Sequence, residues 1–292
     1  MHVPEGYLPV GGAWIHPRAE IGAGARIDPG AVVGAEVVLG PGAWVGPGAV
    51  IYGPTVLGGE NQVHPTAVLG GAPQDTAYRG EPTRLVIGDR NVFREAVTVS
   101  RGSPKGGGET RIGNDCYFMA GSHVGHDCTV GDGVILANDV LIAGHCHLGS
   151  YVNIAGGVAI VQFTSVGRYA FVGGLAGSTM DLEPFIAHDG MPARAKGINL
   201  VGLRRGQFAH ETLNKLKEAF RVLFTDSRKG GDDLAEARRE IERRGAICDE
   251  VVELIDFMQR SRQGRFGRQA QPPKIKLIPE GEGEGGRSEP SS

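Results

Sequence analysis

The sequence predicts a mainly β protein in which a parallel β-helix is followed by a small α-helical domain. Branched aliphatic residues recur every six residues through most of the first two thirds of the chain. Amphipathic patterns of helical period replace this repeat from about residue 199. The 48 glycines among 292 residues are about twice the ordinary share of roughly 7 %, which indicates many turns and short strands.

The six-residue period is the main sign of the β-helix. A helix of 3.6 residues per turn cannot keep positions six apart on one face, whereas a three-sided coil takes six residues per side and points one aliphatic side chain inward from each. Successive coils then stack at about 4.7–4.9 Å, the spacing of paired strands. The inward positions are Ile15, Ile21, Ile27, Val33, Leu39, Val45, Ile51, Leu57, Val63 and Leu69, then Ile87, Phe93 and Val99, then Ile112, Phe118, Val124, Val130, Leu136, Ile142, Leu148, Ile154, Ile160, Val166 and Val172.

Two insertions interrupt the repeat, near residues 71–86 and 100–111. They contain the segments QDTAYRGEPTR and SRGSPKGGGETR. Loops that leave a regular solenoid are often binding elements, with a tolerated surface insertion as the alternative. We expect the β-helix with its two loops to span residues 1–198.

Three helical patterns follow the repeat. Apolar residues line one face of HETLNKLKEAFRVLF, residues 210–224, and of CDEVVELIDFMQRS, residues 248–261. Between them, DDLAEARREIERRG, residues 232–245, is charged and ends on glycine, a helix-stop signal. These patterns predict an α-helical domain over residues 199–267. The low-complexity acidic segment at residues 268–292 is expected to be a disordered tail.

Charge and composition argue against several classes of protein. The formal net charge of −3 gives no reason to expect nucleic-acid binding. No run of 18 apolar residues is present, so we expect no stable insertion in a membrane. The first residues, MHVPEGYLPVGG, lack the basic and apolar regions of a signal peptide. The four scattered cysteines do not suggest a disulfide framework, and a reducing cytoplasm fits them best.

The segment GSHVGHDCTVGDG, residues 121–133, gives the strongest functional signal. Residues three sides apart lie directly above one another in the coil, so this segment lies against two later ones. Gly144 falls above His126, where it is expected to leave open space and an accessible amide over the imidazole. The predicted patch contains His123, His126, Asp127, Gly144, His145 and Gln162.

Three interpretations of this patch are open from the residues alone. The histidines could simply occupy exposed corners of the coil. They could bind zinc, although His145 and His147 alternate along a strand and cannot easily face the same way. His126 could act as a general base, with Asp127 fixing its tautomer and stabilising the imidazolium. We favour the general base and expect no metal.

Four segments resemble the UDP-N-acetylglucosamine acyltransferases of lipid A biosynthesis: QDTAYRGEPTR, SRGSPKGGGETRIG, HVGHDCTVGDGVILAN and GINLVGLRRGQF. The resemblance covers roughly residues 12–265, with both insertions and the helical C-terminus. It implies a left-handed β-helix of hexapeptide repeats, whereas the general rule for parallel crossovers is right-handed. It also implies a homotrimer with active sites between neighbouring β-helices.

The resemblance further implies an acyltransferase that needs no cofactor. A 3-hydroxyacyl chain would pass from acyl carrier protein to the 3-position of a UDP-N-acetylglucosamine-type sugar, by direct attack on the thioester. The catalytic residues would be His126 as general base, Asp127 as its orienter and Gly144 as amide donor to the oxyanion. The substrate-binding residues would be Asp75, His123, His145 and Gln162 for the sugar nucleotide, Asn199, Arg204 and Arg205 for acyl-donor or nucleotide groups, and Gly174 for the acyl chain.

Four positions depart from the family pattern. Ala77 stands where the family has a lysine, Val161 where it has a histidine, Val201 where it has a glutamate and Gly206 where it has an arginine. The departures leave two alternatives: a diverged paralogue that N-acylates a UDP-3-amino sugar or acts on another nucleotide sugar, and a non-catalytic trimeric scaffold. The retained His126 favours an enzyme, and we expect O-acylation rather than N-acylation.

Overall fold

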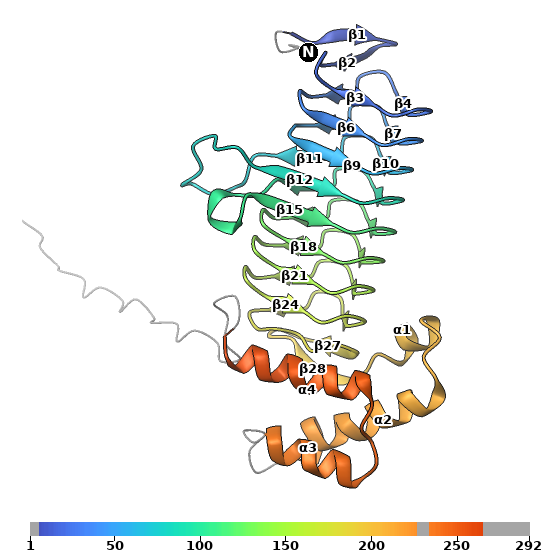
Figure 1. Ribbon diagram of the computed structural model, residues 1–292, viewed down its shortest axis with the longest axis vertical. Helices are drawn as coiled ribbons and strands as arrows, with labels where there is room; N and C mark the ends of the chain where they lie inside the picture. The colour runs from blue at the N-terminus through green and yellow to red at the C-terminus, as the bar shows by residue number, and fades with distance from the viewer. Residues whose placement is uncertain (1–5, 227–233, 265–292) are drawn as a thin grey trace, which may run out of the picture.

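The computed structural model describes residues 6–226 and 234–264. Short strands stack into a long column, and helices lie at its C-terminal end (Figure 1). The predicted acidic tail, residues 268–292, lies outside the described residues.

The column is a parallel β-helix with three sheets, named here A, B and C. Sheet A contains β1 (Leu8–Val10), β2 (Ala13–Ile15), β5 (Val32–Val33), β8 (Val50–Ile51), β11 (Val68–Gly71), β14 (Thr98–Ser100), β17 (His123–Val124), β20 (Leu141–Ile142), β23 (Ala159–Ile160) and β26 (Gly177–Ser178). Sheet B contains β3 (Glu20–Ile21), β6 (Val37–Leu39), β9 (Thr55–Leu57), β12 (Arg84–Ile87), β15 (Glu109–Ile112), β18 (Thr129–Val130), β21 (His147–Leu148) and β24 (Ser165–Val166). Sheet C contains β4 (Arg26–Ile27), β7 (Trp44–Val45), β10 (Gln62–Val63), β13 (Val92–Phe93), β16 (Tyr117–Phe118), β19 (Ile135–Leu136), β22 (Asn153–Ile154), β25 (Phe171–Val172), β27 (Ile186–Asp189) and β28 (Arg194–Ile198).

The pairing register shows where the two insertions enter the coils. Val32 pairs with Val50, three repeats further along the chain, so an uninterrupted coil has the three sides that the six-residue period predicts. The separation is longer between Gln62 and its partner Val92, across the first insertion. The number of residues between Val92 and its partner Tyr117, across the second insertion, also exceeds that of a regular coil. Both insertions therefore add residues to a coil without interrupting the ladder of paired strands.

Both insertions leave the coil at the same corner. The first joins β11 to β12 and the second joins β14 to β15, so each connects sheet A to sheet B. The segments between β17 and β18, β20 and β21, and β23 and β24 turn the same corner in later coils. We call this column of connections the A–B corner. Figure 1 shows both loops, the second with the short helix η1 (Pro104–Gly106), protruding on the same side.

The inward aliphatic residues form the core that the six-residue period predicts. Each of these residues from Val33 to Val172 has at most 2 % of its surface exposed. The first coil differs: Ile15 and Ile27 are only half-buried, and Ile21 is 41 % exposed. Ile21 and Ile27 lie on the terminal strands of their sheets, and Ile15 has only the exposed strand β1 on its outer side, so the stack does not enclose these three residues.

Helices follow directly on the last strand. Asn199 caps the first of them, its side-chain oxygen accepting a hydrogen bond from the Gly202 amide at 3.0 Å. The predicted helix at 210–224 continues as a π-helical turn, and the other two begin and end close to their predicted bounds. The elements are α1 (Leu200–Arg205), α2 (His210–Phe220), η2 (Arg221–Asp226), α3 (Leu234–Arg243) and α4 (Asp249–Arg262).

The helices cover the C-terminal end of the column. Leu216 of α2 and Leu254 of α4 belong to a second apolar cluster that also holds Phe185 and Ile186, at the start of the last coil. Arg168 of the β-helix donates to both carboxylate oxygens of Glu253 in α4, at 3.0 and 2.8 Å. Among the described helices, none is both long enough and apolar enough to span a bilayer.

Burial predicts how two core substitutions should differ. Phe118 is fully buried and stacks on Phe93 of the neighbouring coil, with ring centroids 5.0 Å apart. Phe118→Ala should therefore lower the free energy of unfolding by about 3–5 kcal/mol, through lost apolar contact and a residual cavity. Ile21→Ala, at the exposed first coil, is the matched control and should cost clearly less. Chemical denaturation at one protein concentration measures both, and equal losses would contradict this account.

Candidate active site

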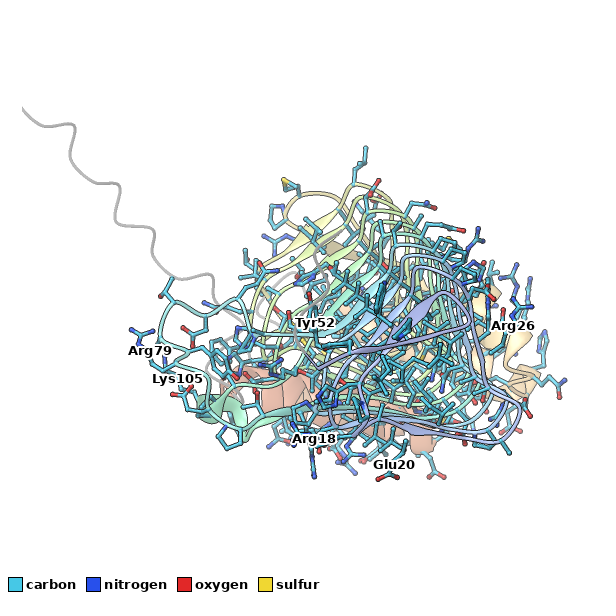
Figure 2. The ribbon with its side chains drawn as sticks, turned by 90° about the horizontal axis from the view of Figure 1, so that it is seen from above. Arg18, Glu20, Arg26, Tyr52, Arg79 and Lys105 are labelled. Carbon is cyan, nitrogen blue, oxygen red and sulfur yellow. The ribbon has the colours of Figure 1, made fainter. Side chains whose placement is uncertain are left out.

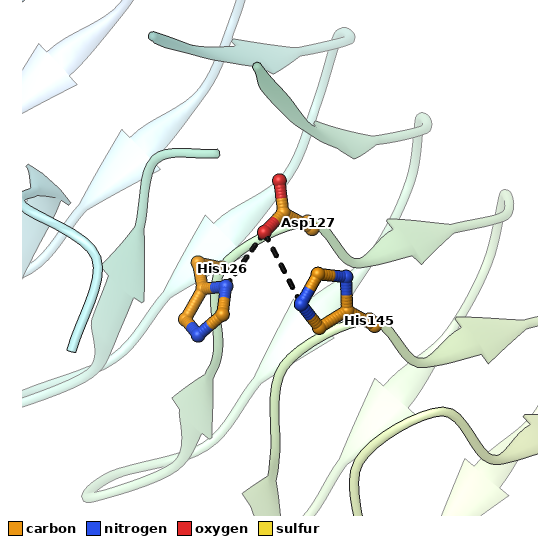
Figure 3. A group of neighbouring side chains, drawn as sticks. All are labelled: His126, Asp127 and His145. Atoms are coloured by element: carbon orange, nitrogen blue, oxygen red, sulfur yellow. Dashed lines mark hydrogen bonds and ion pairs between the residues drawn. The ribbon is translucent and has the colours of Figure 1, made fainter. Parts of the chain in front are cut away.

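The A–B corner brings the predicted catalytic residues together. His126 and Asp127 lie between β17 and β18, and Gly144 and His145 lie one coil later, between β20 and β21. The Asp127 carboxylate lies between two imidazole rings (Figure 3). Its Oδ2 is 2.6 Å from His126 Nδ1 and 3.6 Å from His145 Nε2.

The backbone of the corner aligns these side chains. Asp127, His145 and Phe163 have φ angles of 61°, 60° and 65°, so each turns the corner in the left-handed region. Their side chains consequently form one column. The His145 ring stacks on Phe163, with centroids 4.5 Å apart and planes 11° apart, and meets His126 edge to face at 5.0 Å. This packing fixes both imidazoles.

Asp127 is an almost completely enclosed carboxylate, with 1 % of its side chain exposed. Its Oδ1 accepts from the Ser103 amide at 2.7 Å, and its Oδ2 accepts from the Ser103 hydroxyl at 2.6 Å. Burial alone would raise the pKa of this carboxyl. The hydrogen bonds from His126 and Ser103 outweigh burial and hold the pKa of Asp127 below its usual range. The carboxylate is therefore ionised at neutral pH.

An ionised Asp127 determines which nitrogen of His126 is available. A carboxylate can only accept, so the 2.6 Å contact assigns the proton to His126 Nδ1 and leaves Nε2 as a lone-pair acceptor. An added Cβ at Gly144 would lie 2.9 Å from His126 Nε2. The imidazole thus occupies the space that a side chain at position 144 would need, so glycine is required there to admit the ring. The expectation that glycine leaves this space open was wrong. The Gly144 amide has no hydrogen-bond acceptor among the described residues.

The other two histidines of the patch are held neutral. Burial, reinforced by the proximity of His126, lowers the pKa of His123, whose Nδ1 lies 2.7 Å from the Thr98 hydroxyl. Burial also lowers the pKa of His145, although the Asp127 carboxylate opposes this shift. A neutral imidazole has one donor and one acceptor nitrogen, and Thr98 already contacts one of the two nitrogens of His123. Neutral rings of this kind suit contacts with sugar hydroxyl groups.

The two insertions meet over this patch. Asp75, in the first, accepts from the Ala77 amide at 2.8 Å and pairs with Lys105 Nζ of the second at 3.3 Å. The Ala77 amide, followed by Lys105, lowers the pKa of the Asp75 carboxyl. Lys105 and Arg79 project from the same protruding corner (Figure 2). The sequence reasoning missed Lys105 and Ser103, although both lie in an insertion that it had noted.

Within the described parts of the chain, the group of side chains that most resembles a metal site consists of His126, Asp127 and His145. One ligand atom each from His126, Asp127 and His145 lie within 4.8 Å of one another. However, Asp127 Oδ2 already accepts from Ser103 and His126, and a cation would have to displace these hydrogen bonds. The donor set fits a proton-transfer pair better than a zinc site.

The remaining predicted site residues, apart from Gln162, lie away from the A–B corner. Gln162 is at the A–B corner, but Gly174 lies between β25 of sheet C and β26 of sheet A, at a different corner. Asn199 caps α1 and donates to the Tyr169 carbonyl at 2.8 Å, beside sheet C. Arg204 and Arg205 are in the last turn of α1. One chain alone therefore does not bring these four residues to His126.

The α1 residues border a cavity of their own. It has a volume of about 550 Å³ and lies between sheet C and α1. An added Cβ at Gly206 would lie 2.7 Å from the Tyr169 ring, so this ring fills the space of a side chain at that position. The cavity is lined by residues that include Tyr151, Tyr169, Phe171, Asn199, Val201 and Arg205.

A stack of six-residue repeats with a His–Asp pair at one corner defines a left-handed β-helix acyltransferase of the hexapeptide type. Residues 109–144 match the model of the bacterial transferase hexapeptide, and residues 181–266 match that of the UDP-N-acetylglucosamine O-acyltransferase, domain 2. The chain belongs to the acyl-[acyl-carrier-protein]–UDP-N-acetylglucosamine O-acyltransferase family, and it is an acyltransferase.

The relatives share most of their length with this chain. The family member from Anaeromyxobacter sp. (strain K) is 50 % identical over 256 residues, which are 86 % of this chain and 98 % of that protein. The UDP-N-acetylglucosamine acyltransferase structure from Bacteroides fragilis is 33 % identical and has a TM-score of 0.79, covering 85 % of this chain and 95 % of that one. The Campylobacter jejuni structure is also 33 % identical, with a TM-score of 0.78 and coverage of 85 % and 94 %.

The lowered pKa of His145 predicts a pH dependence of stability. The unfolded chain binds this proton more readily, so stability is complete above the ordinary histidine pKa of about 6.5 and falls as the pH drops through the lower folded value. His145→Gln removes this contribution, and its free energy of unfolding should fall less on acidification. Urea unfolding at near-neutral and mildly acidic pH measures the difference. His210→Gln, on the exposed side of α2, is the matched control, and a wild-type slope in His145→Gln would contradict this assignment.

Proposed function

We propose that this protein transfers a 3-hydroxyacyl chain from acyl carrier protein to the 3-hydroxyl of UDP-N-acetylglucosamine, in the biosynthesis of lipid A. The observation that carries the proposal is the 2.6 Å contact between His126 Nδ1 and an enclosed carboxylate, which leaves Nε2 as a base on a side chain that is 15 % exposed. The relative from Anaeromyxobacter sp. (strain K) is named for acyl carrier protein and UDP-N-acetylglucosamine, which supports the same donor and acceptor here.

The chemistry begins with proton transfer. His126 Nε2 removes the proton of the sugar 3-hydroxyl as its oxygen attacks the thioester carbonyl carbon. Negative charge develops on the carbonyl oxygen, and the free Gly144 amide is the donor that we assign to it. The tetrahedral intermediate then expels the thiolate, which takes the proton back from the His126 imidazolium. Asp127 stabilises that imidazolium and remains ionised throughout. The reaction as written needs no cofactor beyond the acyl carrier protein thioester.

Polar groups around His126 suit a sugar nucleotide. We assign Asp75, His123, His145 and Gln162 to the sugar, because all four lie in the A–B corner column or at its edge. The nucleotide brings a diphosphate, and Lys105 supplies a cation at the mouth of the patch, 65 % exposed and within 3.3 Å of Asp75. This charge offsets the absence of a lysine at Ala77.

We further propose a homotrimer in which the two halves of the site come from neighbouring chains. His126 and Gly174 lie in different coils and at different corners of the β-helix, and Asn199, Arg204 and Arg205 lie beside sheet C. A cyclic trimer can place the A–B corner of one β-helix against the neighbour's other corners. We propose a cytoplasmic location, where acyl carrier protein and UDP sugars are found and the four free thiols stay reduced.

Acyl transfer by the purified protein tests the activity. With a 3-hydroxyacyl carrier protein thioester, UDP-N-acetylglucosamine should be acylated in preference to its 3-amino analogue. His126→Ala should lower the rate by roughly 10²–10⁴-fold, because it removes the general base, while His64→Ala in an early coil serves as the control. A large preference for the amine would favour the N-acylating alternative. Binding of the substrates without turnover would favour the scaffold.

Mixed trimers test the shared site. His126→Ala and Arg205→Ala impair opposite halves, so each should be impaired alone. Random mixing of the two variants should restore about a quarter of the sites, those with one intact half from each chain. Mixing His126→Ala with Asp127→Asn, which impair the same half, should restore nothing. Light scattering at the mass of a single chain, or no recovery in the first mixture, would contradict the shared site.

A further inference from the structure

The second insertion encloses the carboxylate of the catalytic pair. Ser103 lies at its start, is fully buried, and contacts Asp127 twice, through its amide at 2.7 Å and its hydroxyl at 2.6 Å. An added Cβ at Gly106, the last residue of η1, would collide with the Asp127 carboxylate. The loop therefore packs directly on the Asp127 carboxylate.

Ser103 does not have the role that its position suggests. It stands at the N-cap of η1 with a proline next to it, where a serine usually bonds to the amides of its own helix. Its side chain makes no cap hydrogen bond there. The hydroxyl turns instead to a residue 24 positions along the chain. A donor diverted from a local cap to an enclosed carboxylate indicates a function in holding that carboxylate.

We propose that Ser103 is a positioning residue for catalysis: it orients the Asp127 carboxylate toward His126 and limits how strongly that carboxylate attracts the imidazole proton. The inference rests on the general-base role of His126 proposed above. The two donors of Ser103 occupy one lone pair on each oxygen of Asp127, while the Asp127 amide donates to the Thr110 hydroxyl at 2.8 Å. Only the orientation that points Oδ2 at His126 Nδ1 satisfies these contacts together.

The hydroxyl also acts on charge. The Ser103 hydroxyl and His126 Nδ1 both donate to Asp127 Oδ2. Without the hydroxyl, the full negative charge of Oδ2 faces His126, so the carboxylate stabilises the imidazolium more strongly. The base would then be protonated at higher pH. The other charged or titratable groups facing the pair are His123 from β17, His145 from the next coil, the buried thiol of Cys128, Asp75 from the first insertion and Lys105 from the second. None of them is altered by a change at Ser103.

The pH–rate profile of Ser103→Ala tests the proposal. Loss of a hydrogen bond to an ionised group should lower kcat by roughly 10- to 100-fold, with the KM for acyl carrier protein little changed. The acidic limb of the kcat/KM profile should move to higher pH. Ser103→Thr retains the hydroxyl and should restore both properties. The matched control is Ser122→Ala, because Ser122 is equally buried and its hydroxyl has no hydrogen-bond partner among the described residues.

A double-mutant cycle separates positioning from a general structural effect. In an Asp127→Asn background, Ser103→Ala should cause little further loss of kcat, because the group it acts through is gone. Equal losses in both backgrounds, or a Ser103→Ala profile like that of Ser122→Ala, would overturn the proposal. Should Ser103→Ala not fold, Ser103→Cys keeps a weaker donor and should give an intermediate shift of the acidic limb, and an unshifted limb would overturn it. Full activity in His126→Ala would instead refute the general-base role on which this inference rests, and absence of acyl transfer by the wild-type protein would refute the proposed function itself.

Discussion

The closure of every uninterrupted coil after three six-residue sides is the constraint on which the rest of the structure depends. One aliphatic side chain per side fills the core, and the ladder of backbone hydrogen bonds fixes each coil over the last. A slip of one residue would turn the inward side chains outward, so the register is strongly specified. Every corner is consequently a column, and this is how His126 meets Gly144 and Asp127 meets His145 without any shared hairpin or helix.

The column supplies neighbours for Asp127 but too few donors. A carboxylate with 1 % exposure is stable as an ion only when its oxygens accept hydrogen bonds. The coil offers His126, and the insertion after β14 supplies the remaining two donors through Ser103. The second insertion is thus part of the candidate site, because it holds the Asp127 carboxylate. The first insertion contacts the second through the pairing of Asp75 with Lys105.

The six-residue period made the repeating part of the molecule predictable from the sequence, and the helical pattern did the same for the C-terminal helices, but neither period reaches the insertions. The period identifies the fold and the inward residues from Val33 onward, and moving three repeats along the chain from His126 finds the patch. It overestimates the burial of Ile21, because periodicity carries no information about the ends of a stack. Residues inside an insertion have no register, so nothing aligned Ser103 with Asp127, and a serine before a proline suggests a helix cap. The α1 and Gly174 positions rested on family resemblance alone, since no rule of spacing connects different corners.

One departure from the family pattern, Ala77, lies beside a neighbouring residue that supplies the missing charge. Ala77 offers no cation, yet its amide holds Asp75 and Lys105 brings a positive charge to the same carboxylate from another loop. At Gly206 the Tyr169 ring occupies the room of the missing side chain. A diphosphate or a sugar binds to a group at a given position in the site, and that group can come from any part of the sequence. A substitution at a family position therefore indicates a changed substrate only when no neighbour restores the lost group, and at Ala77 a neighbour does.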